Sequence, residues 1–89
     1  MQVLVYRVGE EHGIHARPAG RLVNFVKTLS CDVRITNGAR EADGKKLLAV
    51  MSLGARYGDE LTFCLSGEAE EQEKEALATF LRENMTPDD

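Results

Sequence analysis

The sequence lacks the residues and runs that mark metal centres, disulfide scaffolds and membrane spans. Its two cysteines, Cys31 and Cys64, match no metal-ligand spacing, and we expect both to be reduced thiols in a cytosolic protein. The longest apolar run, Leu47–Met51, is much shorter than a membrane span, and no basic-then-apolar segment marks a secretion signal. We therefore expect a cytoplasmic protein with no membrane insertion, no metal and no cofactor.

The chain also has little positive charge, and the charge that it has is unevenly placed. Its formal net charge is −4, which argues against nucleic acid as a partner. Residues 1–45 contain seven Lys and Arg against five Asp and Glu, whereas residues 46–89 contain four against ten. A basic surface around Arg17 can therefore coexist with an acidic C-terminal half.

Length and patterning predict one small domain. The 89 residues allow a modest core, and the hydrophobic fraction of 43% is typical of a globular protein. No internal repeat, low-complexity tract or linker divides the chain. We expect residues 1–89 to form a single domain.

Hydrophobic periodicity predicts seven elements in the order β-α-β-β-α-β-α. The strands are expected at residues 2–8, 32–36, 40–42 and 60–66, with a tight turn at Asn37-Gly38 between the second and the third. Helices are expected at 16–28, at 47–53 before a terminating Gly54, and from Glu68 onward. This order fits an α+β fold in which helices cover one face of an antiparallel sheet.

The apolar positions predict which residues form the core. In the first strand Leu4, Tyr6 and Val8 share a face, and in the second helix Val50 and Leu53 point inward. The last helix is expected to bury Ala69, Ala76, Leu77, Phe80 and Leu81, and residues 86–89 are expected to fray. Leu47, Leu48 and Met51 form either an exposed docking surface or part of a buried helix, and composition alone does not separate the two.

The segment Gly13–Pro18, Gly-Ile-His-Ala-Arg-Pro, carries the chemistry. Proline is tolerated in the first turn of a helix, so His15 is expected to cap the helix that follows. The free amides of Ala16 and Arg17 and the positive end of the helix dipole favour an anion there. A phosphate on His15 would therefore meet two amides and the Arg17 guanidinium.

Simpler interpretations of these residues remain open at this point. His15 can be an exposed capping histidine beside a solvated arginine, which is the commoner outcome for a short motif. His12 and His15 lie three residues apart, but without a third ligand they are weak evidence for a metal. The glutamates of the last helix, Glu70 to Glu75, are typical of solvated surface charge.

Two motifs together resemble one family. Gly13–Ala19, followed about thirty residues later by Lys45–Gly54, resembles the HPr phosphocarrier proteins of the bacterial phosphoenolpyruvate-dependent sugar phosphotransferase system. The resemblance implies an open-faced β-sandwich, with a four-stranded antiparallel sheet in the order 1-4-2-3 and three helices on one face. It also implies a carrier, not an enzyme in its own right, that accepts a phosphoryl group from enzyme I and passes it to sugar-specific IIA domains.

The resemblance implies residue roles as well. His15 would carry the phosphate on its Nδ1 nitrogen, Arg17 would neutralise the phosphate charge, and Leu47, Leu48 and Met51 would form the apolar part of the docking surface. A carrier that must expose one face is expected to be a monomer.

The sequence departs from the family at three positions. Lys46 occupies the place of a regulatory serine, so that switch is not expected, and Ser52 is no obvious substitute. His12 can hydrogen-bond the phosphate or be a tolerated change, and Gly20 should thin the docking surface.

Two other functions remain as alternatives to the carrier. One is a regulatory module of the same fold that docks on a transcription factor or a metabolic enzyme, against which the intact His15 and Arg17 argue. The other is a hydrolase with a water-labile phosphohistidine, for which His12, Glu10 and Glu11 are the nearby acid or base candidates. The sequence does not identify the sugar or signalling branch that is served.

Overall fold

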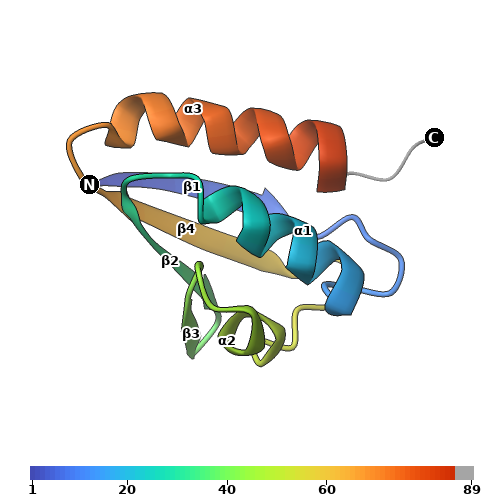
Figure 1. Ribbon diagram of the computed structural model, residues 1–89. Coiled ribbons are helices and arrows are strands. Elements are labelled where there is room, and N and C mark those ends of the chain that lie inside the picture. Colours follow the sequence, from blue (N-terminus) through green and yellow to red (C-terminus); the bar gives the residue numbers. More distant parts are fainter. Residues whose placement is uncertain (86–89) are drawn as a thin grey trace.

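Four antiparallel strands form one sheet, and three helices cover one of its faces (Figure 1). The structure, a computed structural model, describes residues 1–85. Its elements are β1 (Gln2–Arg7), α1 (Ala16–Val26), β2 (Asp32–Asn37), β3 (Arg40–Asp43), α2 (Leu47–Met51), β4 (Glu60–Ser66), α3 (Glu70–Phe80) and a π-helical turn, η1 (Leu81–Met85). The order of the strands in the sheet is β1-β4-β2-β3. The element order and the expected sheet order 1-4-2-3 are thus confirmed.

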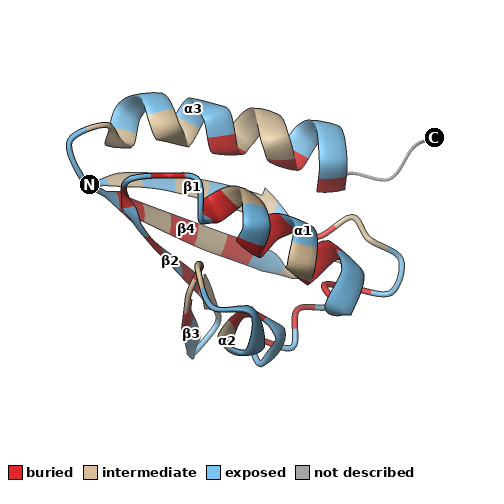
Figure 2. Ribbon diagram, viewed as in Figure 1, coloured by how far each residue is buried: buried red, intermediate tan, exposed pale blue. Residues whose placement is uncertain are grey.

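The core lies between the sheet and the helices. Strands β2 and β4 alternate between buried and more exposed residues, as expected for a sheet with one packed face, and Figure 2 shows the buried stretches gathered beneath the helices. Phe63, Ile35 and Leu22 are among the largest side chains that are wholly buried. Full burial of one such side chain stabilises the fold by roughly 1.5–3 kcal/mol. The predicted core positions Val8, Val50 and Leu53 are confirmed.

The β2–β3 turn lies one residue later than expected. Asn37 pairs with Arg40 in the ladder, so Gly38 and Ala39 are the turn residues. Gly38 has a φ of 62°, and no residue other than glycine has a positive φ in residues 1–85. The prediction that Asn37 occupies the turn was wrong, because a two-residue turn that begins with glycine needs positive φ only at that glycine.

The first two helices are shorter than predicted. Helix α1 ends at Val26 because its last turn tightens, with the amides of Thr28 and Leu29 bonding three residues back. Helix α2 ends at Met51, and Gly54, with a φ of 60°, follows that end of the helix. Three strand boundaries differ by one residue, since β1 ends at Arg7, β2 extends to Asn37 and β3 extends to Asp43.

Helix α3 packs most of its predicted inner face, since Leu77 and the following Leu81 are buried, but Ala76 does not belong to that face. It begins at Glu70, not Glu68, and it buries Leu77 while leaving Ala76 exposed. Ala76 lies about 100° further round the helix than Leu77, on the side that faces solvent. Phe80 is only partly buried, and it stacks on Phe25 of α1 with the ring centroids 4.4 Å apart. The expected fraying of residues 86–89 lies outside the described residues.

Candidate phosphate site at the start of helix α1

His15 is the N-cap of helix α1, as predicted. Its backbone is extended, with φ −94° and ψ −164°, and its carbonyl accepts the first helical hydrogen bond, from the Ala19 amide, at 2.9 Å. The side chain is exposed and makes no capping hydrogen bond. The imidazole is therefore free to meet a group that arrives from outside.

Donors for an anion lie beside this imidazole. The amides of Ala16 and Arg17 have no acceptor within residues 1–85, and Pro18 has no N–H. The Arg17 side chain is exposed and forms no ion pair with the described residues. Unpaired amides at a helix N-terminus and a guanidinium together favour a phosphate.

His12 lies close to His15. Their ring centroids are 6.4 Å apart, with the planes at 64°. Within residues 1–85, no group of three or more His, Cys, Asp or Glu side chains is placed to hold a metal ion. The His12 ring is thus placed edge-on beside that of His15.

The loop before His15 is fixed by a contact with the α2–β4 connection. The Ile14 amide donates to the Ala55 carbonyl at 2.9 Å, and Gly13 has a φ of 76°. A Cβ atom on Gly13 would lie only 2.4 Å from the Ala55 oxygen. Only glycine fits this close approach, so the Gly13–Ala55 contact determines where His15 begins the helix.

The α2–β4 connection is in turn held by side chains that sequence reasoning missed. Asn37 Nδ2 donates to the Leu53 carbonyl at 2.9 Å and lies 3.4 Å from Asp59 Oδ2, and an Arg40 guanidinium N–H donates to the Ser52 carbonyl at 3.0 Å. These partners are 12 to 22 residues apart in the sequence. No periodicity or short motif marks contacts of that range.

Helix α2 presents an apolar surface next to α1. Leu47, Leu48 and Met51 are 41%, 78% and 36% exposed, whereas Val50 is 1% exposed and points into the core. The two helices pack against each other, and Lys46 caps α2. Gly20 on α1 is partly exposed, with open space where a Cβ would lie. Of the two interpretations that composition left open, the structure supports the exposed surface.

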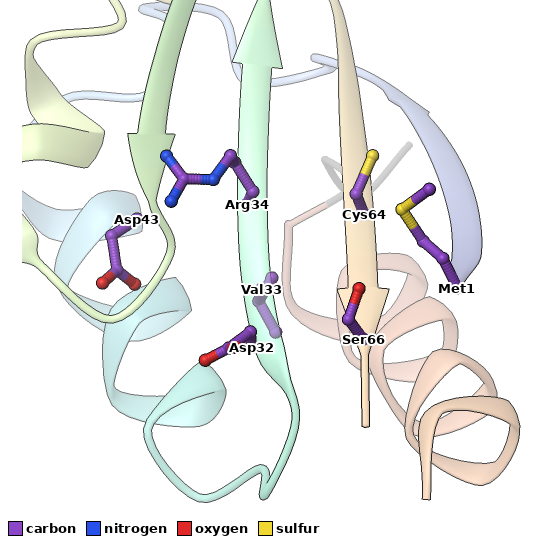
Figure 3. Close-up of a pocket in the computed structure, with 7 residues that line it drawn as sticks. All are labelled: Met1, Asp32, Val33, Arg34, Asp43, Cys64 and Ser66. Atoms are coloured by element: carbon purple, nitrogen blue, oxygen red, sulfur yellow. The ribbon is translucent and has the colours of Figure 1, made fainter. Parts of the chain in front are cut away.

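A hollow also lies away from this site, on the open face of the sheet. It has a volume of about 420 Å³ and is lined by Met1, Asp32, Val33, Arg34, Asp43, Cys64 and Ser66 (Figure 3). None of these residues belongs to the α1 or α2 site. Cys64 is half-buried there, Cys31 is buried, and both are free thiols.

The chain matches a family model over most of its length. The model, described as the PTS HPr component phosphorylation site, matches residues 5–83. The chain belongs to the HPr family. The resemblance noted in the two sequence motifs is confirmed.

Relatives and solved HPr structures agree with this membership. The chain is 36% identical over 83 residues to the phosphocarrier protein HPr of Lysinibacillus sphaericus, covering 93% of this chain and 94% of that protein. It is 38% identical over 73 residues to the multiphosphoryl transfer protein of Salmonella typhimurium, covering 79% of this chain. The chain spans only 19% of the length of that longer relative.

The HPr fold is also found in the solved structure of HPr-C-His from Thermoanaerobacter tengcongensis. The TM-score is 0.88 at 23% identity, with 99% of each chain covered. No helix within residues 1–85 is long and apolar enough to cross a membrane.

Proposed function

We propose that this chain is a phosphocarrier of the phosphotransferase system and that His15 carries the phosphoryl group. The observation that carries the proposal is the exposed imidazole of His15 at the N-terminus of α1, beside two unpaired amides and Arg17. An imidazole that is exposed and fixed by its backbone can meet a partner's phosphoryl group without a pocket of its own. The proposal places this relay in the cytoplasm.

The transfer has two matching steps. An imidazole nitrogen of His15, Nδ1 by the family resemblance, forms a bond to the phosphorus of phosphorylated enzyme I. The bond between that phosphorus and enzyme I breaks, and its electron pair leaves with enzyme I. In the second step a nucleophile of a IIA domain forms a bond to the phosphorus, and the bond between phosphorus and the His15 nitrogen breaks, with its electron pair returning to the imidazole. Arg17 and the amides of Ala16 and Arg17 stabilise the negative charge in both steps.

The docking surface for both partners consists of Leu47, Leu48 and Met51, with Gly20 at its edge. A small, partly apolar surface suits transient encounters, in which a carrier must leave each partner quickly. Lys46 has no hydroxyl, so the proposed carrier is not switched by phosphorylation at that position. The regulatory module is less favoured, because it gives no reason for an exposed His15 beside Arg17.

Phosphorylation of the purified protein tests the proposal. With phosphoenolpyruvate and enzyme I, we expect one acid-labile, base-stable phosphate, which mass spectrometry places on His15 and phosphorus NMR assigns to one ring nitrogen. His15→Ala should abolish the label and leave the fold intact, because the side chain makes no capping contact. The matched variant His12→Ala should keep the label.

The same experiment separates the alternatives. A label that persists in His15→Ala would place the nucleophile elsewhere. No label on the wild-type protein, under conditions that charge a control carrier, would favour the regulatory module. A label that decays quickly without an acceptor would favour the hydrolase. If the label then persisted in His12→Ala, His12 would be the second catalytic group.

A further inference from the structure

The connection between α2 and β4 contains a turn, Arg56–Asp59, whose backbone is held from several sides. The Arg56 amide donates to Asp59 Oδ2 at 2.9 Å, and the Asp59 amide donates to the Arg56 carbonyl at 2.9 Å. Val8 brackets the turn, since its carbonyl accepts from the Gly58 amide and its amide donates to the Asp59 carbonyl, both at 2.8 Å. Gly58 supplies the positive φ, 88°, that such a turn requires. The turn is thus fixed before any partner arrives.

This turn touches the loop that leads to His15. The residue before the turn, Ala55, accepts the hydrogen bond from Ile14 at 2.9 Å. A Cβ on Gly13 would lie 3.1 Å from the Arg56 Cα. The backbone of Arg56 is therefore in contact with the segment two residues before His15, and a protein docked on His15 reaches the turn as well.

Two side chains of this turn, Arg56 and Tyr57, are exposed to solvent. Arg56 is exposed, and Tyr57 is 69% exposed. Neither side chain makes a hydrogen bond or ion pair with residues 1–85. Tyrosine and arginine are the residue types that most often dominate binding energy, and a fixed backbone reduces the entropy lost when they are buried. Exposed side chains of these two types, held on a fixed backbone, are suited to binding a partner protein.

Resting on the proposed function, we propose that Arg56 and Tyr57 form a second contact surface for the phosphorylated donor protein. Before transfer the donor carries the phosphate and His15 does not, so the positive charge of Arg56 adds to the attraction between the two proteins. After transfer the phosphate, with a charge of about −2, lies on His15 and offsets the Arg56 charge. Arg56 therefore contributes more to the encounter with the donor than to the encounter with the acceptor.

Steady-state phosphorylation by enzyme I tests this contact. Arg56→Ala and Tyr57→Ala should each raise the KM of enzyme I for the carrier about fivefold or more, with unchanged melting temperatures. For Arg56→Ala the KM should also depend less steeply on ionic strength than for the wild type, whereas Tyr57→Ala should keep the wild-type dependence. The KM for transfer from Arg56→Ala to a IIA domain that the wild type charges should change less than twofold.

A matched arginine variant controls for the loss of charge. Arg34 is exposed on the open face of the sheet, on the other side from the helices, and Arg34→Ala should leave the KM for enzyme I unchanged (Figure 3). The inference would be overturned if the KM of enzyme I for both variants stayed within twofold of the wild-type value. It would also be overturned if the KM rose equally for transfer from enzyme I and for transfer to the IIA domain. If the wild type itself takes no phosphate on His15, the carrier proposal fails, and the proposed contact of Arg56 and Tyr57 with enzyme I fails as well.

Discussion

At the scale of single residues, Gly13 matters as much as His15. The imidazole supplies the chemistry, but its position follows from the backbone contact between Gly13 and Ala55, which no side chain on Gly13 would permit. The sequence predicted that His15 caps a helix, but it gave no sign of a close backbone approach at Gly13. The structure shows instead a glycine that is needed for close approach, which a pattern of residue types cannot reveal.

Gly13→Ala should destabilise the protein and slow its phosphorylation. The left-handed φ of 76° costs roughly 1–3 kcal/mol for alanine, and the collision with the Ala55 oxygen adds to that cost by weakening the hydrogen bond to Ile14. Urea unfolding at neutral pH measures the first effect, and the rate of labelling by enzyme I measures the second.

Gly38→Ala is the matched control for Gly13→Ala. Gly38 has a similar φ, 62°, but a Cβ there would meet no atom within 4 Å. It should therefore lose stability from the backbone alone and keep the wild-type rate of labelling. Equal losses of stability in the two variants, or a wild-type rate for Gly13→Ala, would show that the Gly13–Ala55 contact does not position His15.

At the scale of elements, helix α2 explains why periodicity predicted some features and not others. Its five residues are too few to define an amphipathic face, so composition left its exposed side undecided. Element types were predicted correctly along the chain because each element has a buried side that repeats at its own period. The end of α1 was predicted too late, because its last turn tightens, and Ala76 of α3 was wrongly placed on the buried side.

Leu48→Glu should weaken docking without unfolding the protein. Leu48 is 78% exposed, so the change should alter the free energy of unfolding by no more than about 0.5 kcal/mol. Burying an unpaired carboxylate against a partner is costly, and the KM for enzyme I should rise about tenfold or more. Labelling kinetics and thermal melting give the two measurements.

Val3→Glu controls for the introduced charge. Val3 is exposed on β1, on the opposite side of the sheet from α2, so a glutamate there should not change the KM for enzyme I. If Leu48→Glu melts far below the wild type, Leu48 belongs to the core and not to a docking surface. If it melts normally and keeps the wild-type KM, α2 is not part of the contact with enzyme I.

At the scale of the whole molecule, the sheet separates two surfaces. The helices cover one face and bring the start of α1, helix α2 and the Arg56–Asp59 turn together, while the other face stays open (Figure 1). Local patterns predicted a sheet with helices on one face, but only the family resemblance gave the order 1-4-2-3. Strand order depends on pairings such as that of β1 with β4, some sixty residues later in the chain, which alternation within a strand does not encode.

One side chain of helix α3 connects that helix to the segment between α1 and β2. Glu73 of α3 was predicted to be surface charge, but its carboxylate accepts hydrogen bonds from the amides of Ser30 and Cys31, each at 2.9 Å, and from the Ser30 hydroxyl at 3.1 Å. Helix α3 is thereby fixed to the connection between α1 and β2. The prediction was wrong for Glu73 because its partners lie more than forty residues earlier in the chain.

Glu73→Gln should lower stability at neutral pH and make it less sensitive to acid. The hydrogen bond with the Cys31 side chain, followed by those from the backbone, lowers the pKa of Glu73 from 4.5 to about 2. A carboxyl with a depressed pKa stabilises the folded state fully above its unfolded pKa, and this contribution is lost as the pH falls from about 4.5 towards 2. The net loss at pH 7 should be about 1 kcal/mol, or roughly 4–8 °C in melting temperature.

Thermal melting between pH 7 and pH 2 checks this expectation, with Glu75→Gln as the control. Glu75 is exposed on the same helix and makes no hydrogen bond or ion pair within residues 1–85, so its variant should follow the wild-type curve. All other acidic groups are shared, so the gap between the wild type and Glu73→Gln isolates this one carboxyl. That gap should be widest at neutral pH and close near pH 2, because protonated Glu73 is as uncharged as glutamine. A gap of constant size across the range would mean that Glu73 stabilises the fold through packing and not through its charge.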